Sequence, residues 1–171
     1  MTSPLPNHPQ AGTRPASPPS TDILLVEDNP REIELTLRPL RELDAGHRIE
    51  VARDGEEALD FLFGRGAFRH RSGLPPPRLV LLNLNLPKVD GFEVLRAVRA
   101  NSRTSMAPVV VLTSSNDPRE LVQSYQLGAN SCVQKPVRYD ELRETLQAVA
   151  RYWLALNLDP AMQLLMPRGR L

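Results

Sequence analysis

Three short runs of continuously apolar residues constrain the fold of this chain more than any other feature. They are residues 23–26 (ILLV), 79–82 (LVLL) and 109–112 (VVVL), and polar residues follow each run at once. A strand with one buried face alternates apolar and polar residues, whereas a strand of a parallel sheet is covered on both faces. The runs therefore predict central strands of a parallel sheet with helices on both sides.

Helical patterns separate these runs. Asn29 precedes Pro30, which suits the first turn of a helix because a missing backbone N–H costs nothing there. Asp117 and Pro118 open a second helix in the same way, and Gly128 is its stop signal. Asp140 is expected to cap the last helix. Two weaker strands, at residues 49–51 and 131–134, complete a βα unit repeated five times. The pattern predicts a doubly wound α/β fold.

Composition narrows the class further. The chain has 171 residues, 41% of them hydrophobic and 24% charged, which indicates one globular domain. A net charge of +1 gives no bulk attraction to nucleic acid or to a membrane surface. Cys132 is the only cysteine and suits a reducing compartment, and no apolar run reaches the roughly 20 residues of a membrane helix. We expect a cytoplasmic protein that binds neither membranes nor nucleic acid.

The ends of the chain differ from its centre. Six of the 17 prolines fall within residues 1–20, among small polar residues. Such a segment buries too little apolar surface to offset its ordering entropy. We therefore expect a disordered, proline-rich tail over 1–20, a globular domain over 21–150 and a C-terminal extension over 151–171. The loop 64–78 carries four arginines and a histidine. It is interpreted as solvated, although a phosphate or an acidic partner is an alternative.

Polar residues at the strand ends predict one site. In doubly wound sheets the site lies beyond the carboxyl ends of the strands. This rule gathers five residues: Glu27, Asp28, Asn83, Thr113 and Lys135. Carboxylates and a backbone carbonyl suit Mg²⁺, and a central carboxylate can attack a phosphoryl group. A lysine and a metal would neutralise the transferring charge.

Four segments carry a resemblance to a known family. They are ILLVEDNP (23–30), LVLLNLNLPKVDG (79–91), VVVLTSS (109–115) and QKP (134–136). Together they resemble the signature blocks of response-regulator receiver domains over residues 21–150. The resemblance implies a flavodoxin-like (βα)5 fold, with five parallel strands in the order 2-1-3-4-5 and here an extended C-terminal helix.

The resemblance also implies roles for single residues. Glu27 and Asp28 form the acidic pocket, and Asn85 offers its backbone carbonyl to the metal. Thr113 is the switching hydroxyl. Lys135 contacts the phosphoryl group, and its bond to Pro136 is expected to be cis.

Two positions depart from the family pattern. Asn83 occupies the phosphoacceptor position, where an aspartate is expected. A neutral amide cannot form an acyl phosphate, and the loss of one charge weakens the expected Mg²⁺ site of Asp28, Glu27, Asn83 and the Asn85 carbonyl. The second departure is Cys132, at a position where many receivers carry an aromatic residue. Cys132 joins Thr113 and Lys135 in the predicted phosphoryl and switch group. Whether Asn83 is natural or an introduced replacement stays open at this stage.

The end of the chain predicts a protein contact. Apolar residues recur with a seven-residue period through the last helix and its extension, and Tyr152 lies next to them in sequence. The predicted dimer contacts are Leu142, Leu146, Val149, Tyr152, Trp153 and Leu156. Packing on the sheet is the alternative for Leu142 and Leu146. The segment ARYWLALNLDP (150–160) resembles the extension of the small regulators that partner bacterial and cyanobacterial phytochrome histidine kinases, in which it takes part in homodimers.

These features predict a single-domain response regulator of a two-component phosphorelay, linked to phytochrome light signalling. Its expected partner is a histidine kinase, and with Asn83 it is expected to be phosphorylation-deficient. About twenty residues follow the domain, too few for a DNA-binding module. The alternative is a pseudo-receiver that binds proteins constitutively. A small phosphatase is a more distant alternative, which Asn83 and Asn85 count against, so no enzyme is expected. The cognate kinase, the downstream target and any dependence of dimerisation on phosphorylation stay open.

Overall fold

The structure is a computed structural model that describes residues 21–160. It contains one five-stranded parallel sheet with the strand order β2-β1-β3-β4-β5. The predicted fold and strand order are therefore confirmed. The predicted tail, residues 1–20, and the last part of the extension, residues 161–171, lie outside the described residues. The strands are β1 (Ile23–Val26), β2 (Ile49–Ala52), β3 (Leu79–Asn83), β4 (Val109–Thr113) and β5 (Ser131–Gln134).

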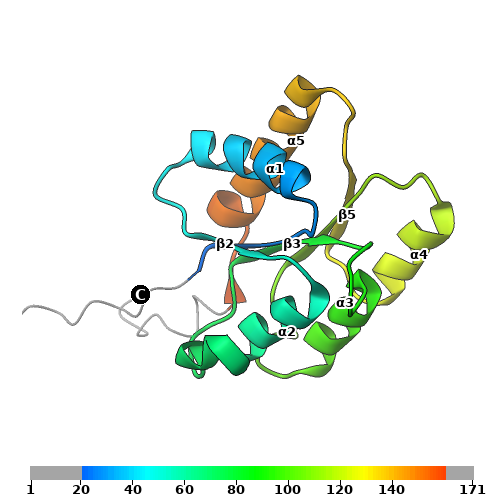
Figure 1. The fold of residues 1–171 in the computed structure, drawn as a ribbon. Helices are drawn as coiled ribbons and strands as arrows, with labels where there is room; N and C mark the ends of the chain where they lie inside the picture. The colour runs from blue at the N-terminus through cyan, green and yellow to red at the C-terminus, as the bar shows by residue number, and fades with distance from the viewer. Residues whose placement is uncertain (1–20, 161–171) are drawn as a thin grey trace, which may run out of the picture.

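Helices cover both faces of this sheet. Figure 1 shows α1 and α5 on one face and α2 and α3 on the other, with α4 beyond α3 near the β5 edge. The five α-helices are α1 (Pro30–Leu43), α2 (Gly55–Phe63), α3 (Gly91–Ala100), α4 (Pro118–Gln126) and α5 (Tyr139–Arg151). A π-helical turn, Tyr152–Leu156, continues α5. No helix of the described region is long and apolar enough to cross a membrane.

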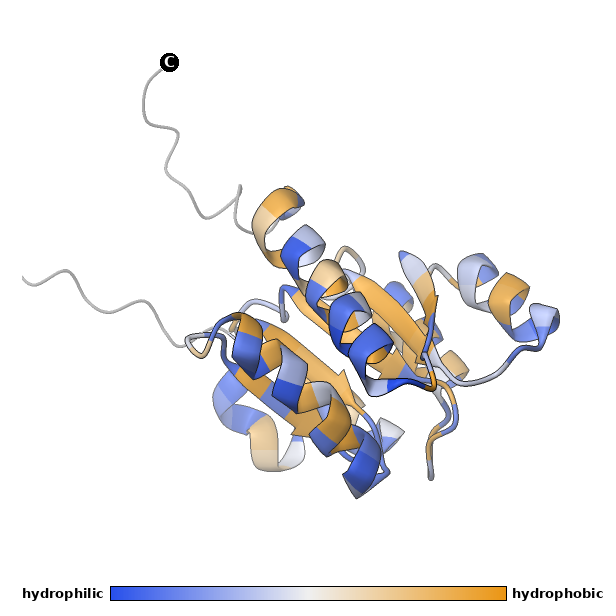
Figure 2. Ribbon diagram, turned by 90° about the horizontal axis from the view of Figure 1, so that it is seen from above, coloured by the Kyte–Doolittle hydropathy of each residue, from blue (hydrophilic) through white to orange (hydrophobic). Residues whose placement is uncertain are grey.

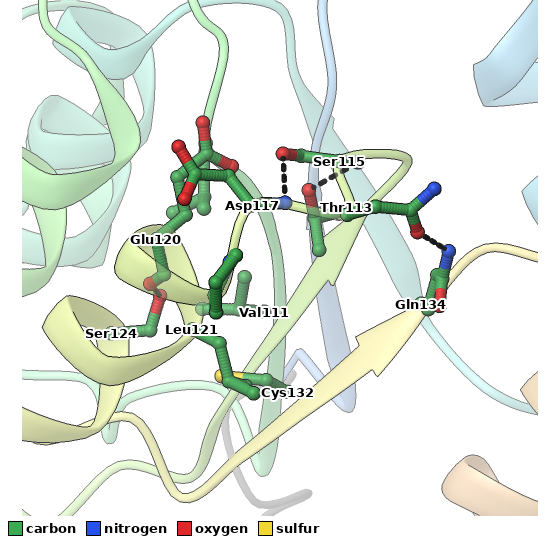
Figure 3. Close-up of a pocket in the computed structure, with 12 residues that line it drawn as sticks. Val111, Thr113, Ser115, Asp117, Glu120, Leu121, Ser124, Cys132 and Gln134 are labelled. Carbon is green, nitrogen blue, oxygen red and sulfur yellow. Dashed lines mark hydrogen bonds between the residues drawn. The ribbon is translucent and has the colours of Figure 1, made fainter.

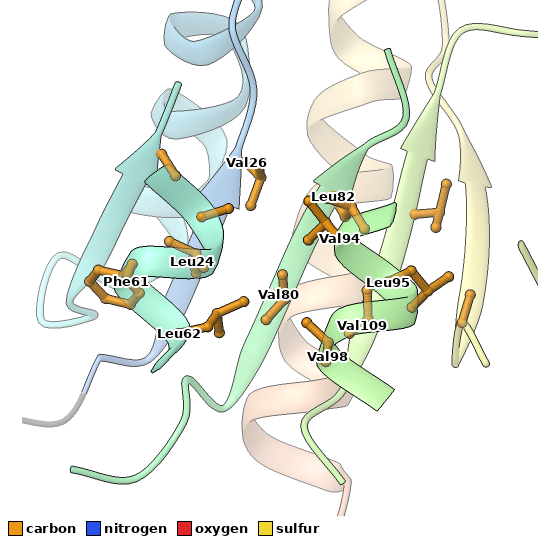
Figure 4. Close-up of a cluster of buried hydrophobic side chains, with 14 of the residues drawn as sticks. Leu24, Val26, Phe61, Leu62, Val80, Leu82, Val94, Leu95, Val98 and Val109 are labelled. Atoms are coloured by element: carbon orange, nitrogen blue, oxygen red, sulfur yellow. The ribbon is translucent and has the colours of Figure 1, made fainter. Parts of the chain in front are cut away.

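Two hydrophobic cores lie on the two faces of the sheet. Successive side chains of β1 alternate between them: Leu24 packs on the α2 and α3 side, and Leu25 packs on the α1 and α5 side. Figure 4 shows the first core, in which Leu24 and Val80 of the sheet meet Phe61, Leu62 and residues of α3. Figure 2 shows the apolar sheet between helices whose outer faces are polar. The continuous apolar runs are explained by this double coverage.

Local caps set where the helices begin. The Asn29 side chain accepts hydrogen bonds from the backbone N–H groups of Arg31 and Glu32, and Asp117 accepts one from Arg119. Gly128, just after α4, has a φ of +92°, as its stop role requires. The prediction for α5 is wrong by two residues, because that helix begins at Tyr139 and places Asp140 in its first turn, after an N-cap at Arg138 that makes no side-chain bond.

The basic loop 64–78 is not wholly solvated as expected. A 3₁₀ helix, η1 (Gly66–Arg71), forms there, and the Arg71 side chain is buried. Its guanidinium donates to Thr21 Oγ1 (2.9 Å) and to the carbonyl oxygens of Phe61 (3.3 Å) and Pro75 (3.4 Å). It also lies 3.8 Å from the centre of the Phe61 ring. Arg71 therefore joins α2, the start of β1 and the proline-rich loop.

Replacing Arg71 with methionine should lower the free energy of unfolding by about 2–3 kcal/mol, because two buried acceptors and one partly buried acceptor lose their donor. Urea denaturation followed by circular dichroism measures this change. Arg69→Met is the matched control, because Arg69 is exposed in the same 3₁₀ helix, and it should change stability by less than about 0.5 kcal/mol. Equal effects of the two substitutions would contradict the structural role of Arg71.

Candidate functional site

The predicted site residues stand at the carboxyl ends of the strands. Glu27 follows β1, Asn83 ends β3, Thr113 ends β4 and Lys135 follows β5. Direct hydrogen bonds join Glu27 to both Asn83 and Lys135. Three of the predicted residues thus meet at one edge, although 56 and 108 positions of sequence separate Glu27 from its partners.

A buried ion pair forms the centre of this group. Lys135 Nζ lies 2.7 Å from Glu27 Oε2, and only 8% and 3% of the two side chains are exposed. Glu32 Oε2, in the first turn of α1, is 3.5 Å from the same nitrogen. Charge-assisted hydrogen bonds of this kind are roughly twice as strong as neutral ones. Sequence reasoning missed Glu32, whose only signal was its place five residues after Glu27 on the helix that the Asn29 cap begins.

Asn83 turns its amide nitrogen into the pocket. Nδ2 donates to Glu27 Oε1 and to the backbone carbonyl of Asn85, both at 3.2 Å. Oδ1 accepts a hydrogen bond from the Asn85 backbone N–H at 3.4 Å. Every polar atom of the Asn83 amide group therefore has a partner within the site.

The loop after β3 holds Asn83 in this position. A Cβ atom at Gly91 would lie 2.4 Å from the Asn83 carbonyl oxygen, so only glycine lets α3 start this close to the strand. Asp90 and Glu93 form a reciprocal capping box at the start of α3. Lys88 in the same loop pairs with Asp54 at 2.7 Å, which anchors the loop to the start of α2.

Asp28 and Thr113 lie less directly in the site. Asp28 is exposed next to Glu27. Thr113 Oγ1 accepts a hydrogen bond from the backbone N–H of Ser115 at 3.0 Å, and the Thr113 carbonyl accepts one from the Lys135 backbone N–H at 2.8 Å. Thr113 is thus connected to Lys135 through the backbone and not through its hydroxyl.

The Lys135–Pro136 bond corrects one prediction. The described residues contain no cis peptide bond, so this bond is trans and the expected cis bond is wrong. An X–Pro bond prefers trans by about 0.5–1 kcal/mol unless the surroundings favour cis.

The residues present do not fit a bound cation as they are arranged. Among the described residues, no group of three or more Asp, Glu, His or Cys side chains could hold a metal ion. Glu27 Oε1 accepts from Asn83, Glu27 Oε2 accepts from Lys135, and the Asn85 carbonyl accepts from Asn83. Of the four predicted ligands, only exposed Asp28 keeps a carboxylate outside this hydrogen-bond network.

A cavity of about 290 Å³ lies beside the site, between α4 and the ends of β4 and β5. Figure 3 shows Val111, Leu121 and Cys132 near its base, and Thr113, Ser115 and Gln134 near the strand ends. Cys132 lines this cavity with a small side chain.

Tyr125 of α4 is a residue that sequence reasoning missed. Its hydroxyl accepts a hydrogen bond from the Cys132 backbone N–H at 3.3 Å, which ties α4 to the edge strand β5. The aromatic side chain of this region therefore comes from the helix and not from the strand.

The last helix corrects the predicted dimer set. Leu142 and Leu146 are buried in the core between α5, α1 and the sheet, and Val149 and Trp153 pack against the same core. Because α5 packs along α1, these apolar residues are covered within their own subunit and are not free for a dimer contact. Of the predicted set, only Tyr152 and Leu156 are exposed large hydrophobics, at 50% and 72%.

Arg78 holds the extension against the sheet. Its Nη2 donates to the Leu154 carbonyl, and its Nη1 lies 3.7 Å from the Asp22 carboxylate. Leu154 itself is buried in the core of α1, α5 and the sheet.

The fold and the site define a class of protein: a five-stranded receiver with its acidic residue and lysine joined at the carboxyl edge. The chain belongs to the response regulator receiver domain family, whose model matches residues 23–147. Rcp1 of Synechocystis is 36% identical over 146 residues, which are 85% of this chain and 97% of Rcp1. The probable methanogenesis regulatory protein FilR2 of Methanothrix harundinacea is 41% identical over 138 residues, 81% of this chain and 86% of the relative.

Solved structures give the same relationship. The bacteriophytochrome response regulator AtBRR is 46% identical, with a TM-score of 0.65 over 82% of this chain and 100% of its own. The Mn²⁺-bound form of Rcp1 is 36% identical, with a TM-score of 0.75 over 83% of this chain and 99% of its own. The phosphorylated cyanobacterial phytochrome response regulator RcpA has a TM-score of 0.76 at 32% identity, over the same shares of the two chains. The chain is a response regulator related to phytochrome response regulators.

The Cys132 thiol gives a pH-dependent prediction. Burial raises its pKa above the ordinary value, and a hydrogen bond with Ser124 offsets part of this rise. The folded chain should therefore react with iodoacetamide at pH 8 more slowly than the urea-unfolded chain, because the thiolate is the reactive form. Mass spectrometry of timed samples measures both rates.

The free energy of unfolding should depend on pH for the same reason, because the pKa of Cys132 differs between the folded and unfolded states. Below about pH 8.5, the pKa of an unfolded cysteine, the thiol is neutral in both states and its contribution is fully present. As the pH rises from there through the higher folded pKa, the unfolded state gains by ionising first, so this contribution is lost. Cys132→Ser should remove that dependence. A folded chain that is alkylated as fast as the unfolded one would contradict the burial of this thiol.

Proposed function

We propose that this chain is a single-domain response regulator of a two-component phosphorelay in phytochrome-linked light signalling, acting in the cytoplasm through protein contacts and not as an enzyme. Position 83 is its phosphoacceptor position. With Asn83 the chain is phosphorylation-deficient. The observation that carries this proposal is the direct hydrogen bonding of Glu27 to Asn83 and Lys135 at the carboxyl edge of the sheet.

The chemistry of position 83 explains both halves of the proposal. A carboxylate oxygen there would attack the phosphorus atom, form a new P–O bond and expel the phosphoryl donor as its leaving group. Lys135 is held close by Glu27 and Glu32 and would offset the charge of the transferred group. The neutral amide of Asn83 lacks the anionic oxygen that begins this step.

A cleft next to the site suits the kinase. It has a volume of about 570 Å³ between α1 and the loop from β5 to α5, and its wall includes Leu35, Pro136 and Val137 beside Lys135. Val137 is fully exposed. An apolar rim next to the phosphoacceptor position fits a helix of a histidine kinase. The relationship to bacteriophytochrome response regulators favours a bacteriophytochrome as this kinase.

Asn83→Asp should restore phosphorylation. We expect this variant, incubated with Mg²⁺ and acetyl phosphate, to gain one phosphoryl group as the P–O bond to acetate breaks and acetate leaves. Intact-mass spectrometry measures the addition of about 80 Da, and the parent chain under the same conditions should gain none. Mg²⁺ is included because hard oxygen ligands bind it and a carboxylate at 83 adds one such ligand.

Asn85→Asp is the matched control for this experiment. It adds the same charge two residues away, but the role expected for Asn85 uses only its backbone carbonyl, so no phosphorylation should follow. A folded Asn83→Asp variant that gains no phosphoryl group would overturn the phosphorelay proposal. Phosphorylation of the parent chain would overturn the assignment of position 83.

Homodimerisation is part of the proposal. Tyr152, Leu156 and Leu158 are exposed on and just after the turn that follows α5. An exposed apolar cluster of this kind is typical of a protein contact. The segment carrying it resembles the extension that takes part in homodimers of phytochrome response regulators.

Leu156→Ser should weaken the dimer. Removing one buried leucine from an interface costs about 1.5–3 kcal/mol, which raises the dissociation constant about tenfold or more. Sedimentation velocity over a concentration series measures this constant. Val137→Ser, at a fully exposed apolar residue just before α5, should leave it unchanged. A parent chain that stays monomeric throughout would overturn the homodimer proposal.

The second candidate is a pseudo-receiver that binds its partner constitutively. It is favoured by one observation: the network of Glu27, Asn83 and Lys135 is complete without a phosphoryl group. For this candidate, partner binding by the parent chain and by Asn83→Asp would be equal with and without acetyl phosphate.

A further inference from the structure

We propose that the Asn83 amide takes the place of a divalent cation in this pocket, so that the chain holds its strand ends together without metal. This competition takes place in the protein with Asn83 and does not depend on a phosphorelay. Asn83 does more than remove a negative charge, because its amide competes with the cation for the same oxygen atoms.

The amide nitrogen lies where two candidate ligands converge. Nδ2 is 3.2 Å from Glu27 Oε1 and 3.2 Å from the Asn85 carbonyl oxygen. An amide NH₂ group has two donors, and both are used by these two oxygens. The amide hydrogens present a partial positive charge to the oxygens that a cation would otherwise bind.

The amide oxygen is held as well. Oδ1 accepts a hydrogen bond from the Asn85 backbone N–H. To offer Oδ1 to a cation, the amide would have to rotate, and rotation would place NH₂ against the Asn85 N–H donor. The orientation that satisfies the loop is therefore the orientation that turns hydrogens, and not oxygen, toward Glu27.

Charge supports the same conclusion. Glu27 and Lys135 are nearly buried and carry opposite charges, so these two charges offset each other, and Glu32 is a further, partly exposed acid beside Lys135. A carboxylate at position 83 would place a second negative charge beside Glu27, 3.2 Å from an oxygen in the present arrangement. That arrangement would call for a cation, because like charges this close destabilise each other. The neutral amide of Asn83 adds no second negative charge beside Glu27, so this arrangement does not call for a cation.

Comparing the cation affinity of Asn83→Ala with that of the parent chain distinguishes competition by the amide from simple loss of charge. Alanine at position 83 has the same charge as asparagine and one potential ligand oxygen fewer. If charge and ligand number alone decided affinity, Asn83→Ala would bind a cation no more tightly than the parent chain. If the amide competes, Asn83→Ala would bind more tightly, because the Asn85 carbonyl loses its Asn83 donor and Glu27 Oε1 keeps only the Asn29 backbone N–H, at 3.2 Å.

The experiment titrates Mn²⁺ alone into the full chain and follows the free ion by electron paramagnetic resonance. We expect Asn83→Ala to bind Mn²⁺ about tenfold more tightly than the parent chain, since two hydrogen bonds no longer have to be broken. Asn83→Asp should bind more tightly still. Asn85→Ala is the matched control, because it keeps the backbone carbonyl and should bind as the parent chain does.

Circular dichroism shows whether Asn83→Ala folds. If it does not fold, a second measurement on the parent chain still tests the proposal. In ¹⁵N-labelled parent chain, the side-chain NH₂ resonances of Asn83 should stay unshifted at 10 mM Mg²⁺, while amide resonances near exposed Asp28 are free to move. Parent chain that binds Mn²⁺ as tightly as Asn83→Ala, or Asn83 resonances that shift with Mg²⁺, would overturn the proposal. Neither result bears on phosphorylation of Asn83→Asp, so the two proposals fail separately.

Discussion

The sheet is covered by helices on both faces, and this constraint decides where polar chemistry can occur. Side chains of β1, β3 and β4 are almost all buried, so these strands can carry charge only where they end. Parallel pairing then brings the strand ends to one edge. Glu27 follows the central strand β1 and Lys135 follows the edge strand β5, and the two meet there as a buried ion pair.

The edge works as a connected network. Glu27 uses one carboxylate oxygen for Lys135 and the other for Asn83, and Asn83 continues the chain to the Asn85 backbone. A buried carboxylate is stable only when its partners are complete. In this chain the neutral side chain of Asn83 completes the hydrogen bonds between Glu27 and the Asn85 backbone.

Much of this arrangement follows from local sequence. Continuous apolar runs predict strands covered on both sides, and Asn29 and Asp117 cap helices through bonds to residues two or three positions away. The strand-end rule then places Glu27, Asn83 and Lys135 together without any knowledge of their contacts. These predictions succeed because each depends on a short segment or on a topology that the βα alternation fixes.

The rest depends on contacts between distant segments. Arg71 reaches Thr21 across 50 positions, and nothing in a basic loop indicates which arginine turns inward. Leu142 and Leu146 follow the same rhythm as Leu156, but only the first two pack in the core with α1 and the sheet, and the rhythm alone does not distinguish them. The direction of the Asn83 amide is set by the loop after β3, because Asn85 offers it an acceptor and a donor two residues away.

Asp22 and Arg78 fix where the C-terminal extension is anchored relative to the pocket. Asp22 directly precedes β1, and Arg78 directly precedes β3, and together they hold the Leu154 carbonyl at the end of the C-terminal helix. Glu27 and Asn83 stand at the opposite ends of the same two strands. Each strand is therefore a rod of about 13–17 Å with a pocket residue at one end and an anchor of the extension at the other. The two strands pair in register and are buried on both sides, so the pocket residues and the anchor of the extension stand at opposite ends of one buried two-strand unit.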